Sequence, residues 1–409
     1  MKKHIMILMF FLIGSLLIGC STKSNTVIKK EVSEKKVLIN EIPKKEDKIV
    51  ITAQKGTPEW TFENLVKAVE EKNQSDFMKF QNKNNEVFFK EQQRWIEEVI
   101  YKKDHGFKIS ISFYGFQQES DSKGTVVFSV QMDDQTKGSK TNAVTYECIK
   151  EGNVWLLNDV PFKKLSDDSN GITVFYTEDQ REAAKTMMTD AKDIVAFYSE
   201  NFHWKPNPIS IKIYSSDEEA SATVPYIQLS GWNETGESLK ISTEQQPISS
   251  VFSILAHELT HKMLSDLSND NASLYIQEGF ATYLENRVQR DKAGAIHFNQ
   301  RIVDEKAKKA IEVSKSILSI EELGKIDPLD PETSFPLYRD GSLISNYLVL
   351  TYGIDKYLEM LNYLSTFDYI DKRAEHKLAI LDKRTVEALE KVYGSTKELS
   401  AAYKDFYLK

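Results

Sequence analysis

The stretch His257-Glu258-Leu259-Thr260-His261 gives the strongest indication of fold and chemistry in this chain. On an α-helix, residues four positions apart lie on one face, so the two imidazoles can bind a single metal ion. Glu258 lies beside that face, where it can take a proton from a water molecule whose pKa the metal lowers. Apolar residues recur around the motif at helical spacing: Val251, Ile254, Leu255, Leu259 and Leu264. The motif is therefore predicted to lie on a helix, as this chemistry requires.

A third ligand is needed, because catalytic zinc keeps three protein ligands and leaves a fourth position for water. Glu278 is the candidate. It follows the turn Asn269-Asp270-Asn271 and opens a second predicted amphipathic helix, which carries Ile276, Phe280, Tyr283 and Leu284. The sequence thus predicts one zinc ion (Zn2+) held by His257, His261 and Glu278, although two imidazoles and a carboxylate also suit other divalent ions.

The residues after Glu278 are expected to support this site. Thr282 lies one helical turn further on, where its hydroxyl is predicted to hydrogen-bond a ligand imidazole. Glu285, one turn beyond Thr282, is predicted to face away. Gly279 and Ala281 are small and could let the two metal-binding helices approach closely, although ordinary helix packing explains them equally well.

The chain resembles the gluzincins, the metallopeptidase group that includes thermolysin and the zinc aminopeptidases, and most closely their peptidase MA-like domains. The resemblance covers roughly residues 171–409. It rests on the H-E-x-x-H motif, on Glu278-Gly279-Phe280-Ala281-Thr282-Tyr283 and on Tyr338-Arg339-Asp340-Gly341, which resembles a Tyr-x-x-Gly segment of the aminopeptidase branch. It implies that Tyr338 stabilises the oxyanion, whereas the residue type alone is equally compatible with a packed aromatic side chain.

One segment departs from the family pattern. The aminopeptidases carry a Gly-x-Met-Glu-Asn strand whose glutamate holds the substrate amine, and the corresponding segment here is Gly231-Trp232-Asn233-Glu234-Thr235. The resemblance makes Glu234 a possible amine anchor, but Asn233 replaces the methionine and Thr235-Gly236 is typical of a hairpin turn. An aminopeptidase and an endopeptidase that binds substrate along an edge strand therefore both remain open.

The amino terminus resembles a bacterial lipoprotein signal. Lys2 and Lys3 precede an apolar run, which ends in Leu17-Ile18-Gly19-Cys20. We expect residues 1–19 to be a signal peptide and Cys20 to be the lipidated residue that anchors the protein on the extracytoplasmic face of the bacterial cell membrane. An uncleaved anchor is the alternative, and it would place the rest of the chain on the same side. Residues 20–50 are rich in Lys, Glu, Ser and Asn and are predicted to be a flexible tether.

Composition limits the remaining possibilities. A chain of 409 residues suits two domains, and its net charge of −8, with Lys and Glu interspersed, gives no indication of nucleic-acid binding. There are 2 cysteines. If Cys20 is lipidated, no disulfide within the chain is possible, and Cys148 is predicted to be a small buried apolar residue.

Residues 51–167 are predicted to form an accessory α+β domain. Two helical stretches begin near Thr57 and Phe88, and four alternating runs predict strands at 107–113, 125–132, 142–150 and 153–160. Helices followed by an antiparallel sheet resemble a small cone of the nuclear-transport-factor-like type. Because the segment has one histidine, His105, and no evident acid–base cluster, it is interpreted as a positioning or partner-binding module.

The second half, residues 171–409, is predicted to be the α+β catalytic domain with a thermolysin-like, gluzincin fold. Strands are expected at 172–176 and 209–214, followed by a hairpin over 226–242 whose second arm borders the substrate. Helices are expected through 183–198, over the two metal-binding segments, and at 300–316, 320–323, 343–352, 386–393 and up to 408. Gly353 is predicted to end its helix as a carboxy-terminal cap.

These features together predict a lipid-anchored, extracytoplasmic zinc metallopeptidase that hydrolyses a peptide or protein substrate with metal-activated water. The alternative is a catalytically weak or inactive peptidase-like module that recruits a partner at the membrane. The intact Glu258 argues against this alternative, because a module that only binds metal has no need of a base.

Overall fold

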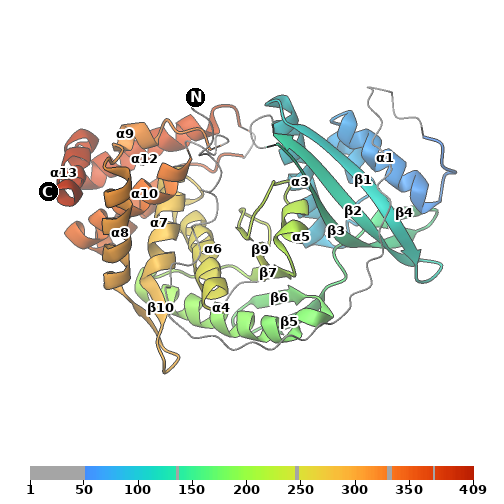
Figure 1. Cartoon of the computed structure of the whole chain (residues 1–409), viewed down its shortest axis with the longest axis horizontal. Coiled ribbons are helices and arrows are strands. Elements are labelled where there is room, and N and C mark those ends of the chain that lie inside the picture. The colour runs from blue at the N-terminus through green and yellow to red at the C-terminus, as the bar shows by residue number, and fades with distance from the viewer. Residues whose placement is uncertain (1–50, 135–137, 245–247, 329–333, 372–373) are drawn as a thin grey trace, which may run out of the picture. The chain divides into compact units, whose positions relative to one another are not determined.

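The computed structural model describes residues 51–134, 138–244, 248–328, 334–371 and 374–409, which combine helices and strands as expected for the α+β class (Figure 1). The predicted signal peptide, Cys20 and the tether lie outside the described residues. Within the ranges given above, no helix is both long and apolar enough to cross a bilayer.

The accessory half begins with helices and continues as an antiparallel sheet in the order β1-β2-β3-β4. Apolar side chains alternate along the second strand, so Val126, Phe128 and Val130 are buried on one face, against which α1 and α3 pack. The elements are α1 (Pro58–Glu70), α2 (Gln74–Met78), α3 (Glu86–Asp104), β1 (Lys108–Gln118), β2 (Lys123–Asp134), β3 (Gly138–Glu151) and β4 (Val154–Leu157). The predicted helices and the four strands are confirmed, whereas α2 was not predicted. Cys148 is buried as predicted.

A mixed sheet forms the base of the second half, in the order β5-β6-β7-β9-β8. Its strands are β5 (Lys163–Asp167), β6 (Ile172–Tyr176), β7 (Ile209–Tyr214), β8 (Gly231–Trp232) and β9 (Leu239–Ser242). The helix α4 (Arg181–Phe202) connects β6 to β7, which are parallel, as are β7 and β9. The short α5 (Asp217–Ala222) precedes β8.

The arm of the 226–242 hairpin that lies at the edge of the sheet differs from the prediction. The second arm of the hairpin, β9, lies inside the sheet because it pairs in parallel with β7. The first arm, β8, pairs with β9 and is the edge strand. β5 is the edge strand at the other end of the sheet, and Gly231 and Trp232 form the edge beside Glu258.

Helices make up most of the remaining chain, as predicted. They are α6 (Ile248–Ser268), α7 (Leu274–Arg287), α8 (Gln300–Ser314), α9 (Ile320–Leu323), α10 (Phe335–Tyr352), α11 (Ile354–Leu364), α12 (Lys377–Tyr393) and α13 (Thr396–Leu408), with a hairpin of β10 (Val288–Arg290) and β11 (Ile296–Phe298) after α7. The hairpin and α11 were not predicted. Gly353 ends α10 with φ 88°, in agreement with the prediction.

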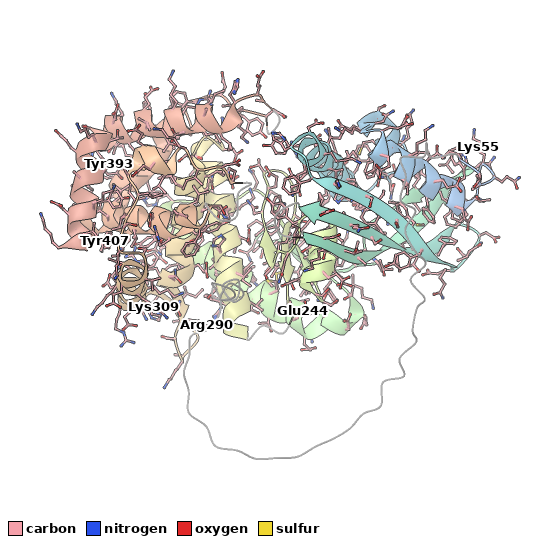
Figure 2. The ribbon with its side chains drawn as sticks, turned by 45° about the horizontal axis from the view of Figure 1, so that its top comes forward. Lys55, Glu244, Arg290, Lys309, Tyr393 and Tyr407 are labelled. Carbon is pink, nitrogen blue, oxygen red and sulfur yellow. The ribbon has the colours of Figure 1, made fainter. Side chains whose placement is uncertain are left out.

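Long-range polar contacts hold the hairpin and the last helix in place. Arg290 forms ion pairs of 2.8 Å with Asp190 and Asp193 of α4, which fix β10 to that helix. The hydroxyl of Tyr407 donates to the carbonyl of Leu343 at 3.0 Å and ties α13 to α10. Figure 2 labels Arg290 and Tyr407.

Two clusters of buried apolar residues fill the structure, and the boundary predicted at residues 167–171 does not separate them cleanly. One cluster belongs to the second half alone. The other lies under the accessory sheet but includes Tyr214, Ala220 and Ala222 from β7 and α5. The two halves therefore share part of a core.

Candidate metal centre

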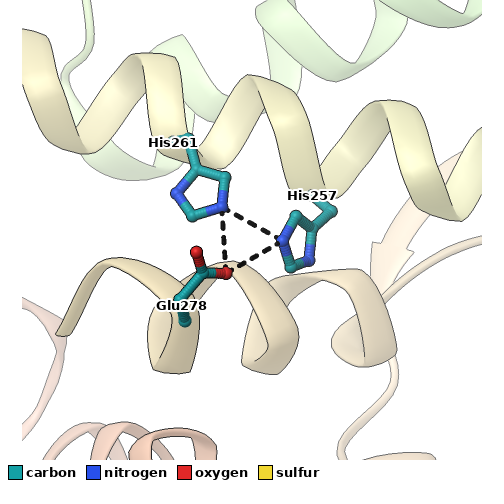
Figure 3. Close-up of side chains that lie close together, drawn as sticks. All are labelled: His257, His261 and Glu278. Carbon is teal, nitrogen blue, oxygen red and sulfur yellow. Dashed lines mark hydrogen bonds and ion pairs between the residues drawn. The ribbon is translucent and has the colours of Figure 1, made fainter. Parts of the chain in front are cut away.

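The H-E-x-x-H residues lie on α6, one side of which packs into the apolar core. Leu255, Leu259 and Met263 are fully buried against the sheet and its neighbouring helices. The hydroxyl of Thr260 donates to the Ala256 carbonyl at 2.7 Å and lies 2.9 Å from the hydroxyl of Tyr198 on α4. Burial of this side of α6 leaves the two histidines on the side that faces α7 (Figure 3).

Three candidate ligand atoms converge between α6 and α7. Nε2 of His257 and Nε2 of His261 are 3.1 Å apart. Oε2 of Glu278 lies 3.3 Å from Nε2 of His261 and 3.6 Å from Nε2 of His257 (Figure 3). The predicted third ligand is thus brought to the two imidazoles.

The chemistry of this cluster fits a divalent cation. Oε2 of Glu278 is buried and makes no contact with hydrogen-bond geometry, although both Nε2 atoms lie within ion-pair distance. A buried carboxylate oxygen costs free energy unless a positive charge satisfies it. Two imidazole nitrogens that face each other at hydrogen-bond distance also compete for one proton, whereas a metal ion accepts lone pairs from both. Two imidazoles and one carboxylate form the ligand set of known catalytic zinc sites.

The charges around the cluster favour a cation as well. Burial disfavours the ionised forms of His257 and Glu278, but their mutual attraction outweighs it. The pKa of the Glu278 carboxyl is lowered, and the pKa of His257, which also faces Glu285, is raised well above its usual value. Without a metal ion, the raised pKa favours a proton on His257.

Both imidazoles are oriented through their second nitrogen. Nδ1 of His257 lies 3.1 Å from Oε2 of Glu285, and Nδ1 of His261 lies 3.4 Å from Oε1 of Gln277. A carboxylate or carbonyl partner of this kind fixes the tautomer and makes the imidazole a better ligand. Apart from their contact with each other, the two imidazoles therefore meet three side chains of α7: Gln277, Glu278 and Glu285.

Two predictions about α7 were wrong. Glu285 does not face away, because seven residues make almost two helical turns and return it to the face of Glu278. The predicted hydrogen bond from Thr282 to an imidazole is not formed, since both Nδ1 atoms contact Glu285 and Gln277 instead. The Thr282 carbonyl accepts a hydrogen bond from Asn286.

Glu258 lies beside the cluster and against the edge strand. Burial raises its pKa, while the two histidines partly oppose this effect. A Cβ atom on Gly231 of β8 would collide with Oε1 of Glu258 and would lie 2.9 Å from Cγ2 of Ile254. Only glycine lets the edge strand approach the candidate base so closely.

Tyr338 reaches the cluster from α10. The charge of Glu278, followed by burial, raises the pKa of Tyr338 well above its usual value, and the hydroxyl therefore stays protonated and able to donate. The helices α7 and α10 cross at two glycines, where their backbones are in contact. A Cβ atom added to Gly279 would lie 2.6 Å from the Gly341 Cα. Gly279 thus allows close approach of α7 to α10, a contact that was not predicted.

Glu234, the possible amine anchor, is not one of the residues that the structure gathers at the metal cluster. It follows β8, and its charge contributes to the raised pKa of Glu237, after burial and the effects of Lys240 and Glu91. Cys20 lies outside the described residues.

Comparison with known proteins adds no family assignment. No model of a known protein family matches the chain, and a search of curated proteins found no match.

Proposed function

We propose that the protein is a zinc-dependent peptidase with a thermolysin-like, gluzincin catalytic domain. The observation that carries the proposal is the convergence of His257, His261 and Glu278 beside a buried glutamate. A zinc ion held by these three residues would supply a Lewis acid and lower the pKa of water.

Glu258 and Tyr338 would then have separate roles in catalysis. Glu258 takes a proton from the attacking water and passes it to the leaving amine, a role that a raised carboxyl pKa favours. Tyr338 remains protonated and donates to the oxygen of the scissile carbonyl as negative charge develops there. Glu285 and Gln277 hold the imidazoles in place.

The substrate peptide is proposed to lie along β8. This edge strand is next to Glu258 and offers backbone groups that can pair with an extended chain. Both endopeptidase and aminopeptidase activity are compatible with this arrangement. We further propose that Cys20 carries a lipid, which would hold the enzyme on the extracytoplasmic face of the bacterial cell membrane.

The direct test is metal analysis and peptide profiling of the full chain purified in detergent. One zinc per chain and cleavage of peptides from a mixed library are expected, with loss of both after chelation and recovery on adding zinc. Cleavage restricted to free amino termini would define an aminopeptidase. A chain that binds no zinc, or binds it and cleaves nothing in the library, would contradict the proposal.

A further inference from the structure

One face of α3 in the accessory half contacts the segment that leads to the edge strand. Glu91, Trp95 and Lys102 are spaced four and seven residues apart, so they share that face. Nε1 of Trp95 donates to the Ala222 carbonyl at 3.0 Å, and Nζ of Lys102 donates to the Pro225 carbonyl at 2.8 Å. All three side chains are almost completely buried.

Through Glu91, the same face of α3 also contacts the part of the chain that follows the edge strand. Its carboxylate accepts a hydrogen bond from the Ser238 amide at 3.2 Å and lies 3.4 Å from Nζ of Lys240 on β9. Nζ of Lys212 on β7 lies 2.5 Å from Glu91 and 2.5 Å from Asp159. A buried ion cluster therefore links α3 to the strands that support β8.

Asn142 of β3 adds a second contact from the accessory half. Its side-chain amide donates to the carbonyls of Tyr226 and Ile227 at 2.8 and 3.1 Å. Nζ of Lys102 lies 3.6 Å from the centre of the Tyr226 ring, a cation–π distance. Tyr226 is thus held through its backbone by β3 and through its ring by α3.

Tyr226 in turn lies beside the proposed active site. Its ring packs against Trp232 of β8, with centroids 5.2 Å apart. Trp232 follows Gly231, which abuts Glu258. Both aromatic side chains are partly exposed and offer ring surface to a bound chain.

We propose that the accessory half is a built-in part of the active site: α3 and Asn142 position Tyr226 and β8 beside Glu258, and Tyr226 selects the substrate side chain. The inference rests on the proposed function. The preferred substrates are peptides with an aromatic or large apolar side chain at the position that contacts Tyr226 and Trp232, because such side chains pack well on aromatic rings. Asn142 and Lys102 act as positioning residues.

The test compares Asn142→Leu with the matched control Thr145→Ala, an exposed position of the same strand. Leucine keeps the side-chain volume but removes both donated hydrogen bonds. In the full chain, amide hydrogen exchange over residues 222–232 is expected to become faster in Asn142→Leu and to stay unchanged in the control. The zinc content should stay at the wild-type level in both.

Kinetics provide the second readout. Two peptides that differ only in a phenylalanine or an alanine at the selective position are compared by the ratio of their kcat/KM values, which does not depend on the fraction of folded enzyme. Tyr226→Ala should lower this ratio about tenfold, the range expected when a buried apolar contact is lost. Asn142→Leu should shift it in the same direction.

Wild-type exchange over residues 222–232 in Asn142→Leu would overturn the positioning role, and an unchanged ratio in Tyr226→Ala would overturn the selective role. If the wild-type chain binds no zinc or cleaves no peptide, the proposed function fails and the selective role fails with it. The exchange measurement still decides whether the accessory half holds the segment.

Discussion

Gly279 of α7 and Gly341 of α10 are in backbone contact, and a Cβ atom on Gly341 would lie 2.9 Å from the Gly279 Cα. The residues next to this crossing are functional candidates. Glu278 directly precedes one glycine, and Tyr338 lies one helical turn before the other. The absence of two side chains therefore brings a predicted metal ligand and a predicted oxyanion donor together.

Substitution of Gly341 by alanine should separate these helices. The added methyl group meets the Tyr275 carbonyl as well as Gly279, so we expect a loss of about 1–3 kcal/mol in the free energy of unfolding and a lower kcat. Leu350→Ala, an exposed position on α10, is the control and should change stability by less than about 0.5 kcal/mol. Urea unfolding and peptide hydrolysis measure both effects. Wild-type stability in Gly341→Ala would contradict the close contact.

Glu258→Gln should retain the metal and lose turnover. The amide keeps the shape of the side chain but cannot accept a proton from water, and loss of general-base catalysis lowers the rate by at least about 100-fold. Metal content and hydrolysis are measured on the same sample. Glu200→Gln on the exposed side of α4 should behave like the wild type. Unchanged hydrolysis in Glu258→Gln would remove this residue from the mechanism.

Glu278 and Glu285 should affect metal affinity to different degrees. Glu278→Ala removes a ligand and should release zinc at chelator concentrations that the wild type tolerates. Glu285→Ala leaves Nδ1 of His257 without its partner at 3.1 Å and should weaken zinc binding about 10–100-fold. Titration with a competing chelator ranks the variants. If Glu285→Ala weakens zinc binding more than Glu278→Ala does, Glu285 is the ligand and the assignment of Glu278 is wrong.

Gly231→Ala should lower activity without releasing the metal. The new Cβ atom would collide with Oε1 of Glu258, so either the base or the edge strand must move. A displacement of about 1 Å near the reacting groups can cost about 100-fold in rate. Gly294→Ala in the β10–β11 hairpin has open space around it and serves as the control for the kinetics, although its φ of 91° makes some loss of stability expected. A fully active Gly231→Ala enzyme would show that β8 does not border the base.

Acid should weaken the buried ion cluster through Glu91. Burial raises the pKa of this carboxyl, but the charges of Lys212 and Lys240 outweigh it and hold the pKa at about 2, below the usual 4.5. A carboxyl with a lowered folded-state pKa stabilises the fold above its unfolded pKa, and this contribution is lost as the pH falls from about 4.5 towards 2. Glu91→Gln should be less stable at pH 7 by about 3–5 kcal/mol, because the buried ammonium groups of Lys212 and Lys240 each lose one of their carboxylate partners.

The difference between wild type and Glu91→Gln should then shrink below pH 4.5, as urea unfolding at several pH values would reveal. Glu312→Gln, an exposed position on α8, should match the wild type throughout. A difference that stays constant down to pH 2 would assign the acid sensitivity to other groups.

The convergence of His257, His261 and Glu278 could be predicted because their spacing is local. Two histidines four residues apart and a glutamate on the next helix need only helical periodicity to be placed. Glu285 carried the same signal, since seven residues on a helix return to one face, and the spacing from Glu278 could have revealed it. The partner of Gly279 could not be found this way, because the crossing of α7 and α10 depends on packing between distant segments.

The edge strand and the role of the accessory half could not be predicted from the sequence for the same reason. Pairing of β9 with β7, which places β8 at the edge, joins residues about thirty positions apart. The contact between Asn142 and Tyr226 spans 84 residues, and that between Glu91 and Ser238 spans 147. No local pattern of apolar and polar residues encodes such contacts.

The buried ion cluster also limits how the chain can be divided. A fragment that begins after residue 167 would keep Lys212 and Lys240 but lose Glu91 and Asp159, and it would expose the side of Tyr214, Ala220 and Ala222 that the accessory half covers. Lys212 would then lack both carboxylate partners, and Lys240 would keep only Glu237. A buried ammonium group without its partner opposes folding strongly. The two halves are therefore expected to be inherited together. Exchange of either half between related proteins should be tolerated only when the residues on both sides of the ion cluster change together.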